Sequence, residues 1–250
     1  MASRMAATPQ RVCRTDRDPP VEHASHSEIP AAYQFWTPRR DDISEEGFAY
    51  FRDTWLIRGV GVRQARSVLA LERELIAAAD ACSESSEEFD EIATALGTSD
   101  LEEIPAKVLQ SSAFESITGY YSAGDRMSLV EALDLGIAGL VHALAAAGCW
   151  PAASCRGHGA GSWSASPVVY LAADRHRTTT LQPLVEAAGC GFDVDPARGE
   201  LLMVIGPSVL EMMTLAGMVL EVRSSFTSRR GPRAKRPAVQ GIQLGFDLER

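Results

Sequence analysis

The segment from Ser128 to Gly148 constrains the fold most strongly, because its apolar residues recur at the spacing of an α-helix. Ser128 and Glu131 have the spacing of a capping box, and Gly148 can take the left-handed conformation that ends helices. His142 lies at the edge of the apolar stripe. We therefore predict one long helix with a buried face, formed by Leu129, Leu133, Ile137, Leu140, Val141 and Leu144.

Strand and helix signals alternate after this helix. Short apolar runs between turn residues predict strands, and Thr179-x-x-Gln182 and Pro207-Ser208 predict helix starts. A helix followed by pairs of strands and further helices is typical of the α/β (α+β) class, here a mixed sheet with helices packed on it. After a first strand that ends near Cys155, the expected strands are 167–172, 192–194, 200–205 and 242–248, and the expected helices are 179–189 and 208–222.

The chain divides into three regions. Residues 1–30 mix arginine, aspartate and proline without periodicity, which predicts a disordered arm. Residues 31–125 are predicted to be helical, with capping boxes at Ser85/Glu88 and Ser99/Glu102. Residues 126–250 form the predicted α/β domain, and a mobile basic loop is expected at 223–238, where arginines alternate with Ser, Gly and Pro.

Composition limits the classes of function. The net charge of −9 opposes binding of nucleic acid over the whole surface and leaves only a local basic patch for it. No apolar run approaches the roughly 20 residues that cross a bilayer, so we expect a cytoplasmic protein without a membrane partner. The five cysteines are odd in number and irregularly spaced, which argues against a disulfide framework.

The densest group of reactive side chains follows the long predicted helix, where Cys149, Cys155, Arg156 and His158 fall within ten residues. A cation beside a thiol lowers the pKa of the thiol, so Arg156 would favour a nucleophilic Cys155. The alternative is a packed cysteine at a strand end with His158 exposed. Cys155-x-x-His158 also has ligand spacing, but a closed zinc site needs four ligands, and we therefore assign no metal.

This group resembles the signature of a known family. Ala153-Ser154-Cys155-Arg156-Gly157-His158 is similar to the Ser-Ser-Cys-Ser-Gly-Arg motif of the methyltransferase family of wybutosine synthesis on transfer RNA. The resemblance covers roughly residues 129–222 and implies a loop that holds S-adenosylmethionine or the modified base. On this basis Ser154, Cys155 and His158 are the candidate catalytic residues, and S-adenosylmethionine is the cofactor that the resemblance implies.

A second resemblance lies in the N-terminal half. The stretch 56–69, with Gly59 and Gly61 between apolar residues, resembles the helix-hairpin-helix motif of DNA-repair proteins. Two glycines let a backbone approach a phosphate closely, and the next helix points its N–H groups at the anion. Arg63 and Arg66 would lie beside that phosphate. The alternative is an ordinary corner between helices that needs glycine for its backbone angles.

Two hypotheses of function remain open. In the first, the protein acts on or docks to DNA or RNA through the Cys155/His158 loop, the Gly59/Gly61 turn and the basic loop. In the second, it is a protein-interaction or assembly subunit whose acidic zone between Arg73 and Lys107 pairs with the basic loop, within one chain or across a homo-oligomer. The basic loop residues assigned to nucleic-acid binding are Arg229, Arg230, Arg233, Lys235 and Arg236.

Overall fold

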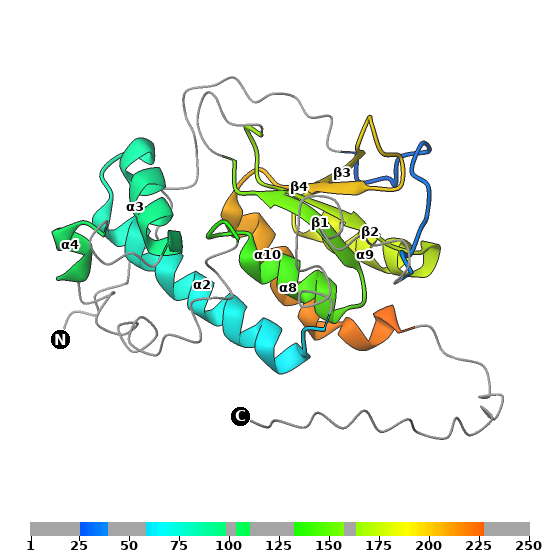
Figure 1. The fold of residues 1–250 in the computed structure, drawn as a ribbon, viewed down its shortest axis with the longest axis horizontal. Helices are drawn as coiled ribbons and strands as arrows, with labels where there is room; N and C mark the ends of the chain where they lie inside the picture. The colour runs from blue at the N-terminus through cyan, green and yellow to red at the C-terminus, as the bar shows by residue number, and fades with distance from the viewer. Residues whose placement is uncertain (1–25, 40–58, 99–103, 111–132, 158–163, 228–250) are drawn as a thin grey trace, which may run out of the picture.

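The computed structural model describes residues 26–39, 59–98, 104–110, 133–157 and 164–227. The N-terminal helices are α2 (Val62–Cys82), α3 (Ser86–Thr98) and α4 (Ala106–Leu109). The C-terminal part contains α8 (Ala138–Ala146), β1 (Trp150–Cys155), β2 (Val168–Ala172), α9 (Arg175–Ala187), β3 (Gly191–Val194), β4 (Leu202–Ile205), α10 (Val209–Glu221) and a 3-10 helix, η2 (Arg223–Phe226). This order of helices and strands confirms the α/β (α+β) class (Figure 1).

The described strands form one sheet in the order β1-β2-β4-β3. Every neighbouring pair is antiparallel, whereas we had predicted a mixed sheet. Antiparallel pairing fits the short turn between β3 and β4, where the Asp195 carboxylate accepts hydrogen bonds from the backbone of Ala197 and Arg198. The predicted strands at 167–172, 192–194 and 200–205 are confirmed, and the one at 242–248 lies outside the described residues.

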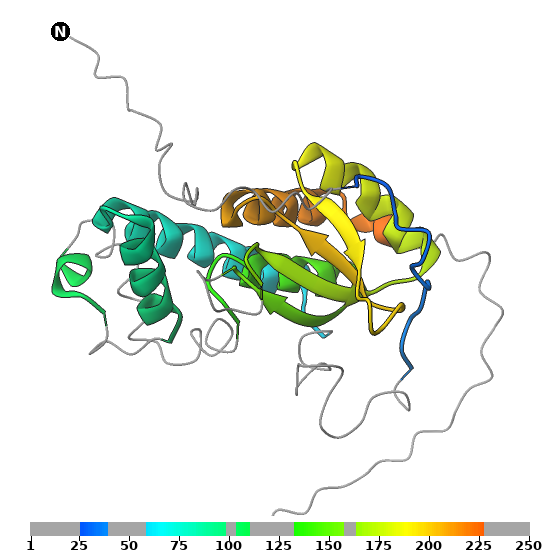
Figure 2. The ribbon, with the colours of Figure 1, turned by 90° about the horizontal axis from the view of Figure 1, so that it is seen from above.

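The helices cover one face of the sheet, which Figure 2 shows from above. Alternate strand residues, among them Val169, Leu171 and Val204, belong to the same buried cluster as the apolar residues of α2, α8, α9 and α10. Their strand neighbours point to the other face, where Trp150 and Ala172 form a smaller buried cluster. All nine residues of α8 are buried, because α2, α10 and the sheet enclose this helix.

Sequence signals at helix ends were reliable where a side chain or glycine sets the geometry. Gly148 and Gly189 have φ of 85° and 71°, and the N–H groups of Gly148 and Cys149 close the end of α8 on Ala145 and Leu144, as in a Schellman motif. Ser208 caps α10, as predicted. The helix expected from Thr179 begins four residues earlier, at Arg175, because the Asp174 side chain accepts a hydrogen bond from the Arg177 backbone.

The long helix predicted from Ser128 is shorter in the structure. Residues 133–137 form a turn and α8 begins only at Ala138, whereas residues 128–132 lie outside the described ranges. Gly136 has φ 99°, which a continuous helix cannot contain. The apolar periodicity still predicted burial correctly, since Leu133, Ile137 and Leu140 are buried. The helical spacing of the apolar residues was therefore predicted correctly, and the first residue of the helix was predicted wrongly.

Residues 26–39 form an extended strap instead of part of an arm and a helix. His26 bridges to Phe192 at the edge strand β3, and the Trp36 N–H donates to the carbonyl of Ala173. The hydroxyl of Tyr33 donates to the Ala173 carbonyl and accepts from its N–H, both at 2.9 Å. Residues 26–30 are therefore folded against the sheet, whereas we predicted them to be part of the arm, and residues 1–25 lie outside the described ranges.

Candidate functional site

Cys155 is the last residue of β1, as the sequence indicated, and it is 1% exposed. It pairs with Val168, on the face of the sheet that the helices do not cover. The Gly157 N–H approaches its sulfur at 3.4 Å. Gly157 has φ 78°, and a Cβ there would lie 2.8 Å from the backbone of Ser166. This close approach of two backbone segments explains the glycine in the motif.

Of the other two candidate catalytic residues, the structure describes Ser154 but not His158. Ser154 is half-buried and pairs with Val169, which belongs to the helix-covered face. Neighbouring strand residues point to opposite faces, so Ser154 and Cys155 do not share one. His158 lies outside the described residues. The proposed cooperation of Cys155 with His158 therefore stays a prediction.

Arg156 has a different partner from the one we expected. Its side chain is 3% exposed and extends to α3, where it forms an ion pair of 2.8 Å with Asp90. The guanidinium also donates to the Asp90 carbonyl at 3.1 Å and to the Thr94 hydroxyl at 2.6 Å. The Arg156 N–H donates to the Asp134 carboxylate at 3.0 Å. Arg156 thus joins the end of β1 to α3 and to the turn before α8, and its charge is engaged with a carboxylate.

The thiols on either side of this motif are poor nucleophiles. Burial raises the pKa of Cys149 to about 12, and it raises the pKa of Cys190 to about 12. Within the described ranges, no group of three or more His, Cys, Asp and Glu side chains is placed to hold a metal ion. The four cysteines in those ranges are thiols, of which Cys82 is the one that is not buried.

We expect alkylation of the native protein to follow this burial. Among the four cysteines of the described ranges, a short pulse of a maleimide should modify Cys82 first, while Cys149, Cys155 and Cys190 should react only after unfolding, because the thiolate must meet the reagent. Peptide mass mapping, with a second isotopic label added in denaturant, gives the ratio at each position. Labelling of Cys155 as fast as Cys82 would contradict the burial described above and would restore Cys155 as a nucleophile.

The second candidate site is the first turn of α2. Gly61 is the N-cap, and it provides no side-chain hydrogen bond to the helix. No acidic residue lies in the first turn, and no atom lies within 4 Å of where a Cβ of Gly61 would stand. Gly59, Arg63 and Arg66 are all exposed. Gly61 thus supplies no side-chain cap to the N–H groups at this helix end, and Arg63 and Arg66 are exposed on the first two turns, an arrangement that favours anions.

The structure also corrects one of the alternatives for this turn. Gly61 has φ −79° and ψ 153°, an extended conformation that any residue adopts, so backbone angles do not require glycine there. The described residues leave open space around Gly61, so a ligand could approach the backbone closely there. The helix that would precede it in a helix-hairpin-helix motif lies outside the described residues.

Part of the predicted mobile basic loop is folded. Residues 223–226 form η2, Phe226 is buried, and the Arg223 guanidinium donates to the Ala146 carbonyl at the end of α8. A cation at a helix C-terminus is favourable, so this contact helps to hold η2 against the end of α8. The remaining basic residues lie outside the described ranges, namely Arg229, Arg230, Arg233, Lys235 and Arg236.

Sequence reasoning missed the buried carboxylate of Glu72 and the two carboxylates that hold Arg156. Glu72 on α2 is fully buried, and its carboxylate accepts hydrogen bonds from the backbone of Gly136 and Gly139. Asp90 and Asp134 hold Arg156, as described above. The one available signal was Glu72, a charged residue among Val68, Leu69 and other apolar positions of α2. Charged residues on an apolar helix face are normally paired or hydrogen-bonded.

Comparisons with known proteins identify no relative. No protein-family model matches the sequence, no curated protein matches it, and no solved structure matches the fold. None of the helices in the described part of the chain is long and apolar enough to cross a bilayer. The assignment of function therefore depends on the geometry of the two candidate sites.

Proposed function

We propose that the protein docks to the phosphate backbone of nucleic acid through the first turn of α2. The observation that carries this proposal is the coincidence of a helix N-terminus that Gly61 does not cap, space at Gly61 that the described residues leave open, and the exposed side chains of Arg63 and Arg66. Backbone N–H groups and guanidinium groups are the donors that position phosphates in such complexes. This mode of binding reads the backbone and not the base sequence.

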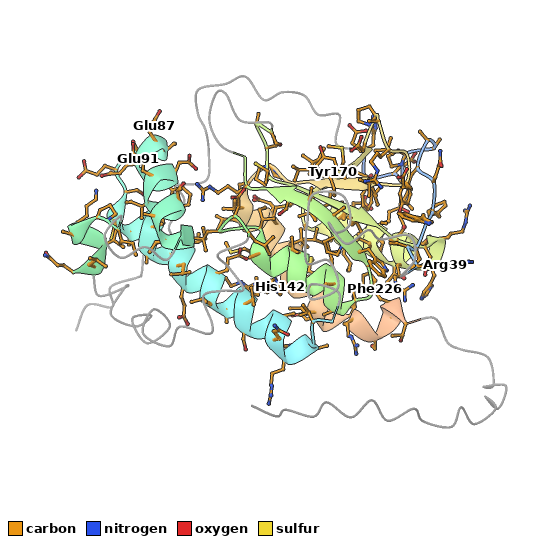
Figure 3. The ribbon with its side chains drawn as sticks, in the orientation of Figure 1. Arg39, Glu87, Glu91, His142, Tyr170 and Phe226 are labelled. Atoms are coloured by element: carbon orange, nitrogen blue, oxygen red, sulfur yellow. The ribbon has the colours of Figure 1, made fainter. Side chains whose placement is uncertain are left out.

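Charge is separated along the N-terminal helices in a way that supports a local anion site. Arg63 and Arg66 are exposed on the first two turns of α2, and Arg73 is exposed near its middle. The acidic side chains gather on α3 instead, beyond the opposite end of α2, where Glu87 and Glu91 lie on the outer side (Figure 3). A protein of net charge −9 can therefore attract a polyanion at one basic end and repel it from the rest of its surface. This difference would orient the complex.

Two variants of equal net charge test this proposal. Arg63→Gln with Arg66→Gln, and Thr179→Glu with Gln182→Glu on α9, both change the formal charge from −9 to −11 (−9 − 2) and both alter positions three residues apart on a helix. We expect the arginine variant to weaken binding of a short duplex DNA or a single-stranded RNA about tenfold and to reduce the slope of log K against log salt by about 2. Fluorescence anisotropy at several salt concentrations measures both quantities.

The α9 variant should bind as the unaltered protein does, because it changes the net charge without touching α2. Equal weakening in both variants would mean that net charge alone governs binding. Absence of binding by the unaltered protein at low salt, for both DNA and RNA, would overturn the proposal. The location consistent with it is the cytoplasm, where the free thiols would also stay reduced. Methyl transfer with S-adenosylmethionine at Ser154, Cys155 and His158 remains a prediction of the sequence resemblance.

An assembly role is the second candidate, and one surface favours it. Glu84, Glu87 and Glu91 are exposed on or beside the first turns of α3. A basic partner, or the basic residues of a second copy, would complement this surface. Light scattering during size-exclusion chromatography separates the two functions, since a salt-sensitive oligomer without affinity for nucleic acid favours assembly.

A further inference from the structure

The carboxylate of Glu72 is buried at the point where α2 meets the start of α8. Glu72 is 0% exposed. Its Oε1 accepts a hydrogen bond from the Gly136 N–H at 2.8 Å, and its Oε2 accepts one from the Gly139 N–H at 2.9 Å. Glu72 therefore caps the N-terminus of α8 from a different helix, and it uses both oxygens to do so.

The turn before α8 fits this carboxylate tightly. A Cβ at Gly139 would lie 2.5 Å from the Glu72 Oε2, and a Cβ at Gly136 would lie 2.7 Å from Val209 on α10. Gly136 also has φ 99°, which side chains rarely adopt. The backbone of this turn is thus held between α2 and α10, and the two N–H groups have little freedom to find other acceptors.

Opposing effects act on the proton of Glu72. Burial raises the pKa of Glu72 to about 7, while the backbone N–H groups and the Arg73 guanidinium act to lower it. Burial lowers the pKa of His142, one turn along α8. Within the described ranges Arg73 is the one charged group that perturbs Glu72. The other charged side chains on the elements packed against α2 are Glu87, Glu88, Asp90, Glu91, Lys107, Glu211 and Glu221, with Asp134 in the turn itself.

The same turn is connected to the end of β1. The Ile137 N–H donates to the Asp134 carbonyl at 3.1 Å, which fixes Asp134 relative to the turn. The Asp134 carboxylate accepts the Arg156 N–H at 3.0 Å. Arg156 in turn reaches Asp90 and Thr94 on α3. A displacement of the turn would therefore be felt at Arg156 and at the neighbouring Cys155.

We infer that Glu72 is a proton-sensitive latch between α2 and the turn before α8. The ionised carboxylate holds the Gly136 and Gly139 N–H groups with one oxygen each. When a proton binds one oxygen, that oxygen becomes a hydroxyl and a weaker acceptor, so one of the two hydrogen bonds loosens and the turn moves with Asp134. The position of the Cys155–Arg156 segment would thus depend on pH near neutrality. This inference is independent of the proposed nucleic-acid docking.

Amide resonances of the folded protein test the latch directly. In ¹H–¹⁵N spectra recorded from about pH 5.5 to about pH 8.5, we expect the Gly136 and Gly139 amides to shift with one common midpoint near the pKa of Glu72, about 7. The Arg156 amide should shift with the same midpoint. Glu74→Gln, a change at an exposed position two residues away on the same helix, should leave all three titrations in place. Glu72→Gln should abolish them.

Stability provides a second measurement on the unaltered protein, in case Glu72→Gln does not fold. A carboxyl whose pKa is about 7 in the folded chain and 4.5 in the unfolded chain binds its proton more tightly when folded. The folding equilibrium constant should then fall as pH rises from about 4.5 to about 7, by up to about 10²-fold from this group. Gly136 and Gly139 amides that stay constant over the pH range, or that titrate unchanged in Glu72→Gln, would overturn the latch.

Discussion

Replacing Arg156 with alanine is expected to lower the free energy of unfolding by about 3 kcal/mol, which is a large share of the stability of a typical domain. The guanidinium is buried, and it has the Asp90 carboxylate, the Asp90 carbonyl and the Thr94 hydroxyl as acceptors. Alanine leaves a cavity the size of the side chain and leaves these acceptors without their donor. The Asp90 side chain is 38% exposed, so water can hydrate it again, which keeps the loss at the lower end of the range for buried pairs.

Two further variants separate this buried pair from an ordinary surface pair. Arg156→Lys keeps the charge but not the planar fork of donors, so its loss should be intermediate. Arg198→Ala breaks an ion pair of 2.9 Å with Glu200 in which both side chains are about one third exposed, and it should cost less than about 1 kcal/mol. Urea unfolding followed by circular dichroism gives the three values. A loss for Arg156→Ala no larger than that for Arg198→Ala would show that Arg156 does not hold β1 to α3.

The sequence predicted those features of the fold that depend on neighbouring residues. Gly148 and Gly189 follow the ends of α8 and α9, and Ser208 caps the start of α10. These positions were predictable because helix capping involves groups only a few residues apart. The start of α8 was predicted wrongly for the opposite reason. The chain turns at Gly136 because Glu72 on another helix accepts its N–H, an interaction between residues 64 positions apart.

In the candidate site too, features set by neighbouring residues were predicted and features set by distant residues were not. The end of β1 at Cys155 and the tight turn at Gly157 follow from local pattern, and both are found in the structure. The role of Arg156 does not follow from it, since its partners Asp90 and Thr94 are 66 and 62 positions away. From the sequence alone, an arginine beside a cysteine suggested activation of the thiol. In the folded chain the same arginine is a structural link between a strand and a helix.

Replacing Gly139 with alanine should destabilise the protein, although alanine is the better helix former by about 1 kcal/mol. A Cβ at Gly139 would lie 2.5 Å from the Glu72 Oε2, 2.8 Å from the Leu69 Cδ1 and 3.3 Å from the Leu69 Cα. The last of these atoms belongs to the backbone of α2, so a rotamer change cannot relieve every contact. The two helices must separate or the Glu72 carboxylate must leave the Gly139 N–H, and we expect a net loss of about 2 kcal/mol.

Gly217→Ala in α10 is the matched control for this prediction. A Cβ there would meet only the end of the Arg73 side chain, at 3.1 Å, and that side chain is flexible. The same chemical change should therefore leave stability unchanged or raise it by up to about 1 kcal/mol. In thermal unfolding, the midpoint temperature of Gly139→Ala should be lower than that of the unaltered protein by roughly 4–8 °C. The midpoint temperature of Gly217→Ala should be equal to or above that of the unaltered protein. If both variants gain stability, α2 and α8 do not approach as closely as described, and Glu72 would be free to accept hydrogen bonds from elsewhere.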